Sequence, residues 1–137
     1  MTDKYASTVS LAGRMLLALM FIPAGFSKLT NIGGTAGYIA SSGLPFPSLL
    51  AVLAGALELF GGLALVIGFK VRWVGLAMAL FTLAASLAFH PFWSVPEGQQ
   101  MVTQLLFMKN MSVVGGMLLI SALGAGALSL DARRSQR

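Results

Sequence analysis

Apolar residues along this chain fall into four long runs, which are separated by short segments rich in glycine, proline or polar residues. The runs cover residues 10–29, 48–69, 73–89 and 102–123. A bilayer hydrocarbon core about 30 Å thick takes about 20 apolar residues of α-helix to cross. The pattern therefore predicts an all-α fold, an integral membrane four-helix bundle that forms a single domain over residues 1–137.

The segments between the runs predict smaller features. We expect a short helix that is begun by Thr35 and stopped by Gly43. The fourth helix should start before it enters lipid, because Ser94 and Glu97 have the spacing of a capping box. The basic C-terminal tail, residues 127–137, is expected to be frayed.

The composition supports a membrane location. The chain is 57% hydrophobic and 9% charged, with a mean hydropathy of +0.86, whereas a soluble domain carries about 25% charged residues. The first run contains the apolar core of a signal peptide, but it continues past Pro23 and three further runs need insertion, so we expect it to be retained. The net charge of +5 is scattered without an aromatic-rich polar surface, which argues against nucleic acid as a partner.

Basic residues predict the orientation, because they concentrate on the cytoplasmic side of membrane proteins. Lys28 and Lys109 fall toward one side of a four-span topology, and the other basic residues fall on the opposite side. We therefore expect both termini to be cytoplasmic and the 30–47 and 90–101 loops to lie on the outer face. The residues on the predicted cytoplasmic side are Lys4, Arg14, Lys70, Arg72, Arg133, Arg134 and Arg137.

Small and polar residues recur at steps of three and four within each run, so each predicted helix has one polar stripe. In lipid such stripes face each other, because small residues let helix backbones approach and polar side chains avoid hydrocarbon. The stripe of the fourth run contains Leu105, Lys109, Ser112 and Gly116. The glycines expected at helix contacts are Gly25, Gly55, Gly62, Gly115 and Gly116.

Glu58 lies near the middle of the second run, where an ionised side chain is costly, so it must be protonated, hydrogen-bonded or paired. At ~1.5 Å per residue, Arg14 and Lys109 are predicted to lie within side-chain reach of Glu58. Lys28 is predicted to lie near the outer rim, at a height similar to that of His90.

Three cations accompany one acid within the runs, so at least one cation in the outer half is expected to lack a protein counter-charge. Two interpretations stay open. In the first, backbone carbonyls and water satisfy these cations. In the second, the bundle presents a small positive cavity to an anionic or carbonyl-bearing ligand. The candidate cavity residues are Arg14, Lys28, Glu58, His90, Lys109, Asn110 and Ser112.

The residue inventory limits the chemistry. The absence of cysteine excludes disulfides, thiol redox catalysis and thiolate metal ligands from this chain. One histidine and four acids do not suffice for a haem held between two histidines, and they make a carboxylate-bridged metal pair unexpected. We expect no covalently bound or metal cofactor, and any electron transfer would need a diffusible ligand or a partner protein.

Several segments in a fixed order resemble the DoxX family of small four-span bacterial membrane proteins. They are GRMLLALMFIPAGFSKL (13–29), LPFP (44–47), LELFGGLALVIGF (57–69), AFHPFW (88–93), FMKNMSVVGG (107–116) and GAGALSLD (124–131). The resemblance implies a bacterial inner-membrane protein of the oxidoreductase or quinol-oxidase-subunit type. It also implies recurring polar positions at Arg14, Lys28, Glu58, His90, Lys109 and Asn110. Relatives that work through cysteines find no counterpart here.

Two functions stay open from the sequence. In the first, the protein is a quinone-linked redox accessory subunit, in which Lys109, Asn110 and His90 donate to a quinone and Glu58 relays protons. In the second, it is a scaffold without catalysis that binds membrane lipid, a protein partner or another copy of itself. A transporter is less favoured, because four short spans offer no inverted repeat.

Overall fold

The computed structural model describes residues 2–136, so Arg137, one of the basic residues behind the predicted orientation, lies outside the described residues. Within that range the chain is helical, without strands. The helices are α1 (Thr2–Thr30), α2 (Ile32–Ser41), α3 (Pro47–Ile67), α4 (Val71–Phe89), α5 (Glu97–Leu123) and α6 (Leu130–Ser135).

Helices α1, α3, α4 and α5 are long and apolar enough to cross a membrane. Their outward-facing side chains include Leu16, Phe60 and Leu119, each more than half exposed. Such a continuous apolar surface requires lipid as its solvent. The predicted all-α membrane bundle is therefore confirmed.

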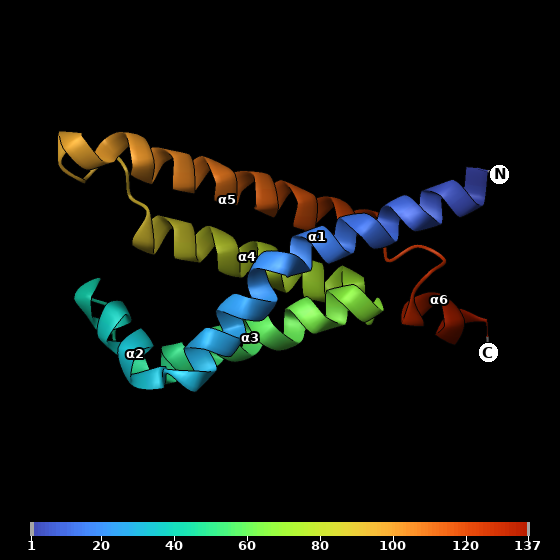
Figure 1. Cartoon of the computed structure of the whole chain (residues 1–137), viewed down its shortest axis with the longest axis horizontal. Coiled ribbons are helices and arrows are strands. Elements are labelled where there is room, and N and C mark those ends of the chain that lie inside the picture. The colour runs from blue at the N-terminus through green and yellow to red at the C-terminus, as the bar shows by residue number, and fades with distance from the viewer. Residues whose placement is uncertain (1, 137) are drawn as a thin grey trace.

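The start of α1 and helix α6 lie at one end of the molecule, and α2 and the α4–α5 loop lie at the other (Figure 1). We call these the N/C end and the α2 end. Four crossings place both termini at the same end, as the topology predicts, whereas the cytoplasmic location of that end stays a prediction.

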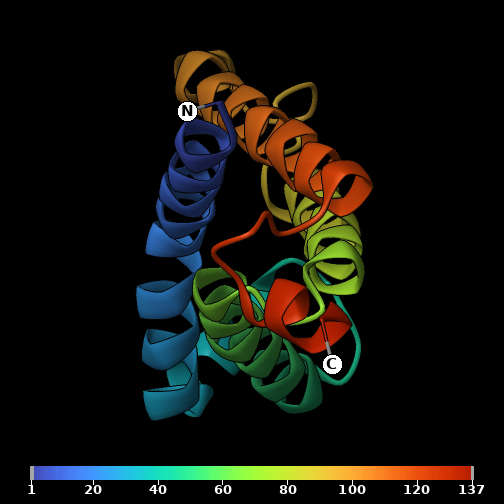
Figure 2. The ribbon, with the colours of Figure 1, turned by 90° about the vertical axis from the view of Figure 1, so that its right-hand side faces the viewer.

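The bundle consists of two helix pairs, in which α1 packs along α3 and α4 packs along α5. Viewed end-on, the four long helices surround a common axis (Figure 2). The α1–α3 crossing is close because Gly25 has no side chain, and a Cβ there would overlap the backbone of Leu59 and Gly55. A Cβ at Gly62 would likewise meet Ile22.

The two glycines of FMKNMSVVGG differ in their surroundings. Gly116 faces Leu17 of α1, whose Cδ2 would lie 3.1 Å from an added Cβ. Gly115 has open space around it, so the predicted helix contact at Gly115 is wrong.

Two helix starts differ from the predictions. The side chain of Asn31, rather than Thr35, caps α2 by accepting a hydrogen bond from the Gly34 amide at 3.1 Å. Helix α5 starts at Glu97, ahead of the apolar run as predicted, but the capping box is wrong because Ser94 donates to the Pro91 carbonyl instead. Pro96, which precedes the first residue of α5, offers no side-chain cap.

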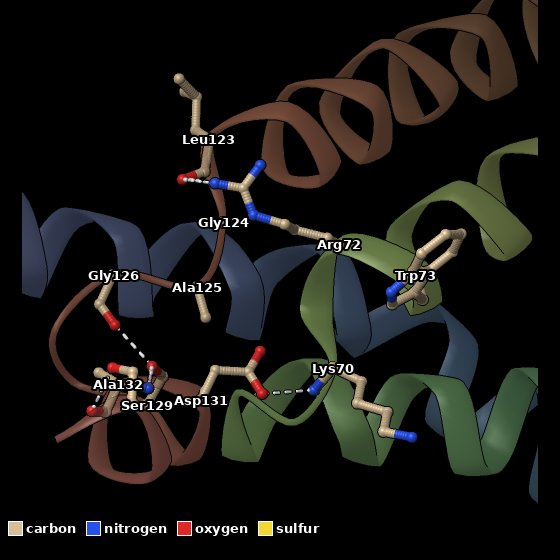
Figure 3. A pocket seen from close by; sticks show the side chains of 11 residues that line it. Lys70, Arg72, Trp73, Leu123, Gly124, Ala125, Gly126, Ser129, Asp131 and Ala132 are labelled. Atoms are coloured by element: carbon tan, nitrogen blue, oxygen red, sulfur yellow. Dashed lines mark hydrogen bonds between the residues drawn. The ribbon is translucent and has the colours of Figure 1, made fainter. Parts of the chain in front are cut away.

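The expectation of a frayed tail is also wrong, because α6 docks on the turn between α3 and α4. The carboxylate of Asp131 accepts hydrogen bonds from the Lys70 amide at 2.7 Å and the Val71 amide at 2.9 Å, which are the first donors of α4 (Figure 3). The Asp131 amide in turn donates to the Gly68 carbonyl at 2.9 Å. An acidic side chain at a helix N-terminus satisfies amides that have no partner within the helix.

Arg14 joins segments of the same end from inside the bundle. Its guanidinium is fully buried and donates to the carbonyls of Leu65 (2.6 Å), Val66 (2.9 Å) and Leu128 (2.6 Å). Leu65 and Val66 belong to the last turn of α3, where carbonyls lack partners within the helix. Arg14 thus joins α1, the end of α3 and the segment before α6.

Candidate functional site

A cavity of about 220 Å³ lies inside the α2 end of the bundle. Helices α1, α2, α3, α4 and α5 all contribute side chains to it. Its polar lining residues are Lys28, Thr35, Tyr38, Glu58, Thr82, His90 and Asn110. Four of the seven residues predicted to share a cavity therefore do so, namely Lys28, Glu58, His90 and Asn110.

The acid of this cavity is paired with a cation other than the ones predicted. The Lys28 ammonium lies 2.7 Å from Oε2 of Glu58, and the Glu58 side chain is 9% exposed. The predicted partners, Arg14 and Lys109, do not contact Glu58. Depth along parallel rods does not predict this pair, because α1 and α3 cross closely and the Lys28 Cβ lies within 3.1 Å of the place that a Gly55 Cβ would occupy.

The pairing leaves acceptor capacity in the cavity. Oε2 of Glu58 has no partner of hydrogen-bond geometry within residues 2–136, so its contact with Lys28 is an ion pair rather than a well-aligned hydrogen bond. A carboxylate has about four acceptor positions on its two oxygens. Lys28 alone does not fill these positions, so the Glu58 carboxylate can accept from a further donor.

A chain of hydrogen bonds fixes the opposite wall. Nδ2 of Asn110 on α5 donates to Oγ of Ser86 at 2.9 Å, and Ser86 donates to the Thr82 carbonyl at 2.7 Å. Thr82 donates to the Met78 carbonyl, also at 2.7 Å. Asn110 is buried, so this contact fixes α5 against α4 and holds the amide of Asn110 at the edge of the cavity.

His90 follows the last residue of α4, and its backbone amide donates to the Ser86 carbonyl at 2.9 Å. Burial lowers the pKa of His90 below its ordinary value of 6.5, and the nearby charge of Lys109 lowers this pKa further. The imidazole is therefore neutral at pH 7, when it has one donor and one acceptor nitrogen.

Three predicted cavity residues lie elsewhere. Arg14 is bonded at the N/C end, and Ser112 is exposed and donates to the Met108 carbonyl of its own helix. Lys109 is exposed, and its Nζ lies 3.8 Å from Sδ of Met20, which lines the cavity, so Lys109 sits at the rim. The buried residues of α5 are Asn110 and Met117, which shows that the predicted stripe through Lys109 and Ser112 was displaced by one residue around the helix.

Aromatic side chains form the walls that the sequence argument missed. Tyr38 of α2 stacks on Phe89 of α4 with ring centroids 5.1 Å apart and an interplanar angle of 18°. Phe21 and Phe81 also line the cavity. No periodic signal identifies Tyr38, because α2 is too short to have a membrane pattern; only the fold places it over the cavity.

The larger hollow at the N/C end, about 540 Å³, is a weaker candidate. Two of its charged side chains are already occupied by backbone groups. Asp131 accepts from the amides at the start of α4, and Arg72 donates to the carbonyls at the end of α5 (Figure 3). Among the described residues, no group of three or more His, Asp or Glu side chains could hold a metal ion.

The fold and the cavity together define a class: a small helical-bundle integral membrane protein in which a paired acid and an imidazole line one cavity. Residues 9–91 match the DoxX family model. The chain is 40% identical to the inner membrane protein YqjF of Escherichia coli (strain K12) over 121 residues, 88% of each chain. It is 34% identical to the inner membrane protein YphA of the same organism over 123 residues, 90% of this chain and 88% of that one.

The chain belongs to the DoxX family, and it is an inner-membrane protein. A shorter similarity, 35% identity over 72 residues, links 53% of this chain to 52% of a Bacillus subtilis (strain 168) protein named "Putative oxidoreductase CatD". No solved structure matches the chain.

Proposed function

We propose that this protein is a quinone-linked redox accessory subunit and that the cavity at the α2 end binds the quinone ring. The observation that carries the proposal is the arrangement of groups around the cavity. Donors just after α4 and on α5 (His90, Asn110) and a paired acid (Glu58) converge from different elements on a space with aromatic walls. The partial similarity to a protein whose name includes oxidoreductase supports the redox class.

The size of the cavity favours a single ring. A volume of 220 Å³ is below the ~300–1,000 Å³ of sites for drug-sized ligands. A substituted quinone ring presents two carbonyl acceptors at opposite edges and two flat faces. The rings of Phe81 and Phe89 suit the faces, and the side chains of Asn110 and His90 suit the carbonyl oxygens.

The chemistry is a two-electron reduction or its reverse. A quinone that takes up two electrons and two protons becomes a quinol, and the O–H bonds form at the two carbonyl oxygens. In the oxidising direction, the Glu58 carboxylate and the neutral His90 imidazole can each accept one proton from a quinol hydroxyl and pass it to water. In the reducing direction, each takes up a proton from water and passes it to a ring oxygen. The electrons come from a partner redox protein, because no side chain of this chain is a cysteine.

The second candidate function is a lipid-binding or partner-binding scaffold without catalysis. The ion pair of Lys28 with Glu58 favours it, because such a pair also fixes the register of α1 on α3. In this case an anionic headgroup would contact Lys109 at the rim and leave the cavity without a quinone.

A binding experiment separates the two functions. We expect purified protein in lipid nanodiscs to hold about one quinone per chain, measured by extraction and mass spectrometry. Asn110→Leu should lower this occupancy at least tenfold, because the variant loses a donor in a buried site. Ser112→Ala, on an exposed face of the same helix, is the matched control and should bind as the wild type does. Wild-type protein that carries phospholipid but no quinone would contradict the redox proposal and favour the scaffold.

A further inference from the structure

A second hollow, entirely apolar in its side chains, adjoins the polar cavity. It lies between α3 and α4 beside the end of α2 and has a volume of about 350 Å³. The two hollows share five lining residues, so they adjoin, one polar and one apolar, with these side chains at their common border. The shared residues are Ile39, Ala54, Phe81, Ala85 and Phe89.

Small side chains on α4 create the apolar part. Ala84, Ala85 and Ala88 line it and leave room that a leucine at the same positions would fill. Leu53 at its edge is 55% exposed, so this groove opens sideways to the acyl chains of the bilayer rather than to water. A molecule that crosses from the bilayer into the polar cavity can therefore keep its hydrocarbon in the groove.

We propose that the groove holds the isoprenoid tail of the ligand whose ring occupies the polar cavity. This inference rests on the proposed function and narrows it: the ligand is a long-tailed membrane quinone that enters laterally between α3 and α4, not a soluble quinone that enters from water. The shared border with the polar cavity selects this groove over another. A larger apolar hollow of about 610 Å³, also between α3 and α4, lies toward the N/C end and shares no residue with the polar cavity.

The groove would position the ligand rather than add hydrophobic free energy to its binding. A tail in the bilayer is already surrounded by hydrocarbon, so its transfer into the groove gives little hydrophobic free energy. The groove instead lets the ring reach Asn110 and Glu58 while its tail is directed back to the lipid. Filling the groove should therefore obstruct a tailed ligand and leave a tail-less ring unaffected.

The test compares two ligands and two variants in lipid nanodiscs. Ala84→Phe fills the groove at an exposed position that does not line the polar cavity. Ala77→Phe is the matched control, because Ala77 is also exposed on α4 but lines the other apolar hollow. Each protein is titrated with a long-tailed isoprenoid quinone and with a tail-less methoxy-methyl benzoquinone, and the dissociation constants are compared.

We expect Ala84→Phe to weaken binding of the tailed quinone at least tenfold and to leave the tail-less quinone within twofold of wild type. Ala77→Phe should bind both as the wild type does. Equal binding of the tailed quinone by Ala84→Phe and Ala77→Phe would overturn the groove while the proposed function stands. Wild type that binds neither ligand would overturn both proposals. If Ala84→Phe does not fold, Ala84→Leu, checked by its thermal midpoint, takes its place.

Discussion

Arg14 offers the sharpest test of how this bundle is held together. The guanidinium is 0% exposed and donates to the three carbonyls of Leu65, Val66 and Leu128. Arg14→Met keeps an unbranched side chain of useful length at this position but removes every donor. The variant leaves the end of α3 and the segment before α6 without their common partner.

The magnitude follows from the number and burial of these contacts. A hydrogen bond from a charged donor contributes about 1.5–3 kcal/mol, and a buried acceptor left without a partner costs about 1–3 kcal/mol. Three such bonds do not add fully, because the freed carbonyls relax together and water can enter at the N/C end. We therefore expect Arg14→Met to lower the free energy of unfolding by about 3–5 kcal/mol.

Arg72→Met is the matched control. Arg72 also donates to carbonyls at a helix end, those of Ser121, Ala122 and Leu123 in α5, but its side chain is exposed. A solvated cation at a helix C-terminus contributes about 0.3–1 kcal/mol. The loss in Arg72→Met should therefore be several times smaller than in Arg14→Met.

The assay is equilibrium unfolding of purified protein in mixed micelles, followed by circular dichroism, for wild type and both variants. Arg14→Lys should fall between wild type and Arg14→Met, because one ammonium cannot reproduce the fork of a guanidinium. Losses below 1 kcal/mol in both methionine variants would show that the contacts of Arg14 do not hold the N/C end together.

Three further predictions concern the α2 end and the α1–α3 crossing. Lys28→Met should destabilise the protein by up to about 3–5 kcal/mol, because it leaves the buried Glu58 unpaired. The double variant Lys28→Met/Glu58→Leu should recover much of this stability in the same unfolding assay. Additive losses from the two substitutions would refute the pairing. Gly25→Ala should cost about 1–3 kcal/mol, because its Cβ overlaps the α3 backbone, whereas Gly13→Ala, in open space on the same helix, should stay near wild type in thermal melts. The pKa of His90 is lowered in the folded chain, so as the pH falls the unfolded chain takes up this proton before the folded chain does. The contribution of His90 to stability is therefore complete above about pH 6.5 and is lost as the pH falls through the lower pKa of the folded state. Melts from pH 8 to pH 5 should show this loss in wild type and less of it in His90→Gln, and parallel curves would contradict it.

The crossing helices could be predicted from the sequence because a bilayer imposes a length and an apolar content that few other structures satisfy. The phase of a helix is harder to predict. In α5 Lys109 and Asn110 are adjacent, so one residue of error, about 100° around the helix, exchanges the exposed lysine for the buried amide. The sequence identified both residues but not which of the two faces inward.

Partners across helices were harder still to predict. Depth along a helix axis is a one-dimensional measure, and it ranked Arg14 above Lys28 as the partner of Glu58. The contact depends instead on the distance between two helix axes, which Gly25 sets by letting α1 touch α3. Asp131 escaped attention for a similar reason, because an acid in a basic tail shows its role only when the tail meets the start of α4.

The charged groups of the two ends differ in their partners, because those at the N/C end bond to backbone groups and those at the α2 end pair with each other. At the N/C end, Arg14 and Asp131 bond to backbone groups that the helix ends would otherwise leave without partners, and only Nε of the Arg14 guanidinium has no hydrogen-bond partner among the described residues. At the α2 end, Glu58 and Lys28 are paired with each other beside a space, and acceptor capacity remains on the carboxylate. A buried charge pair contributes little net stability, so the ligand that we propose would give the pair of Lys28 and Glu58 a role that folding alone does not.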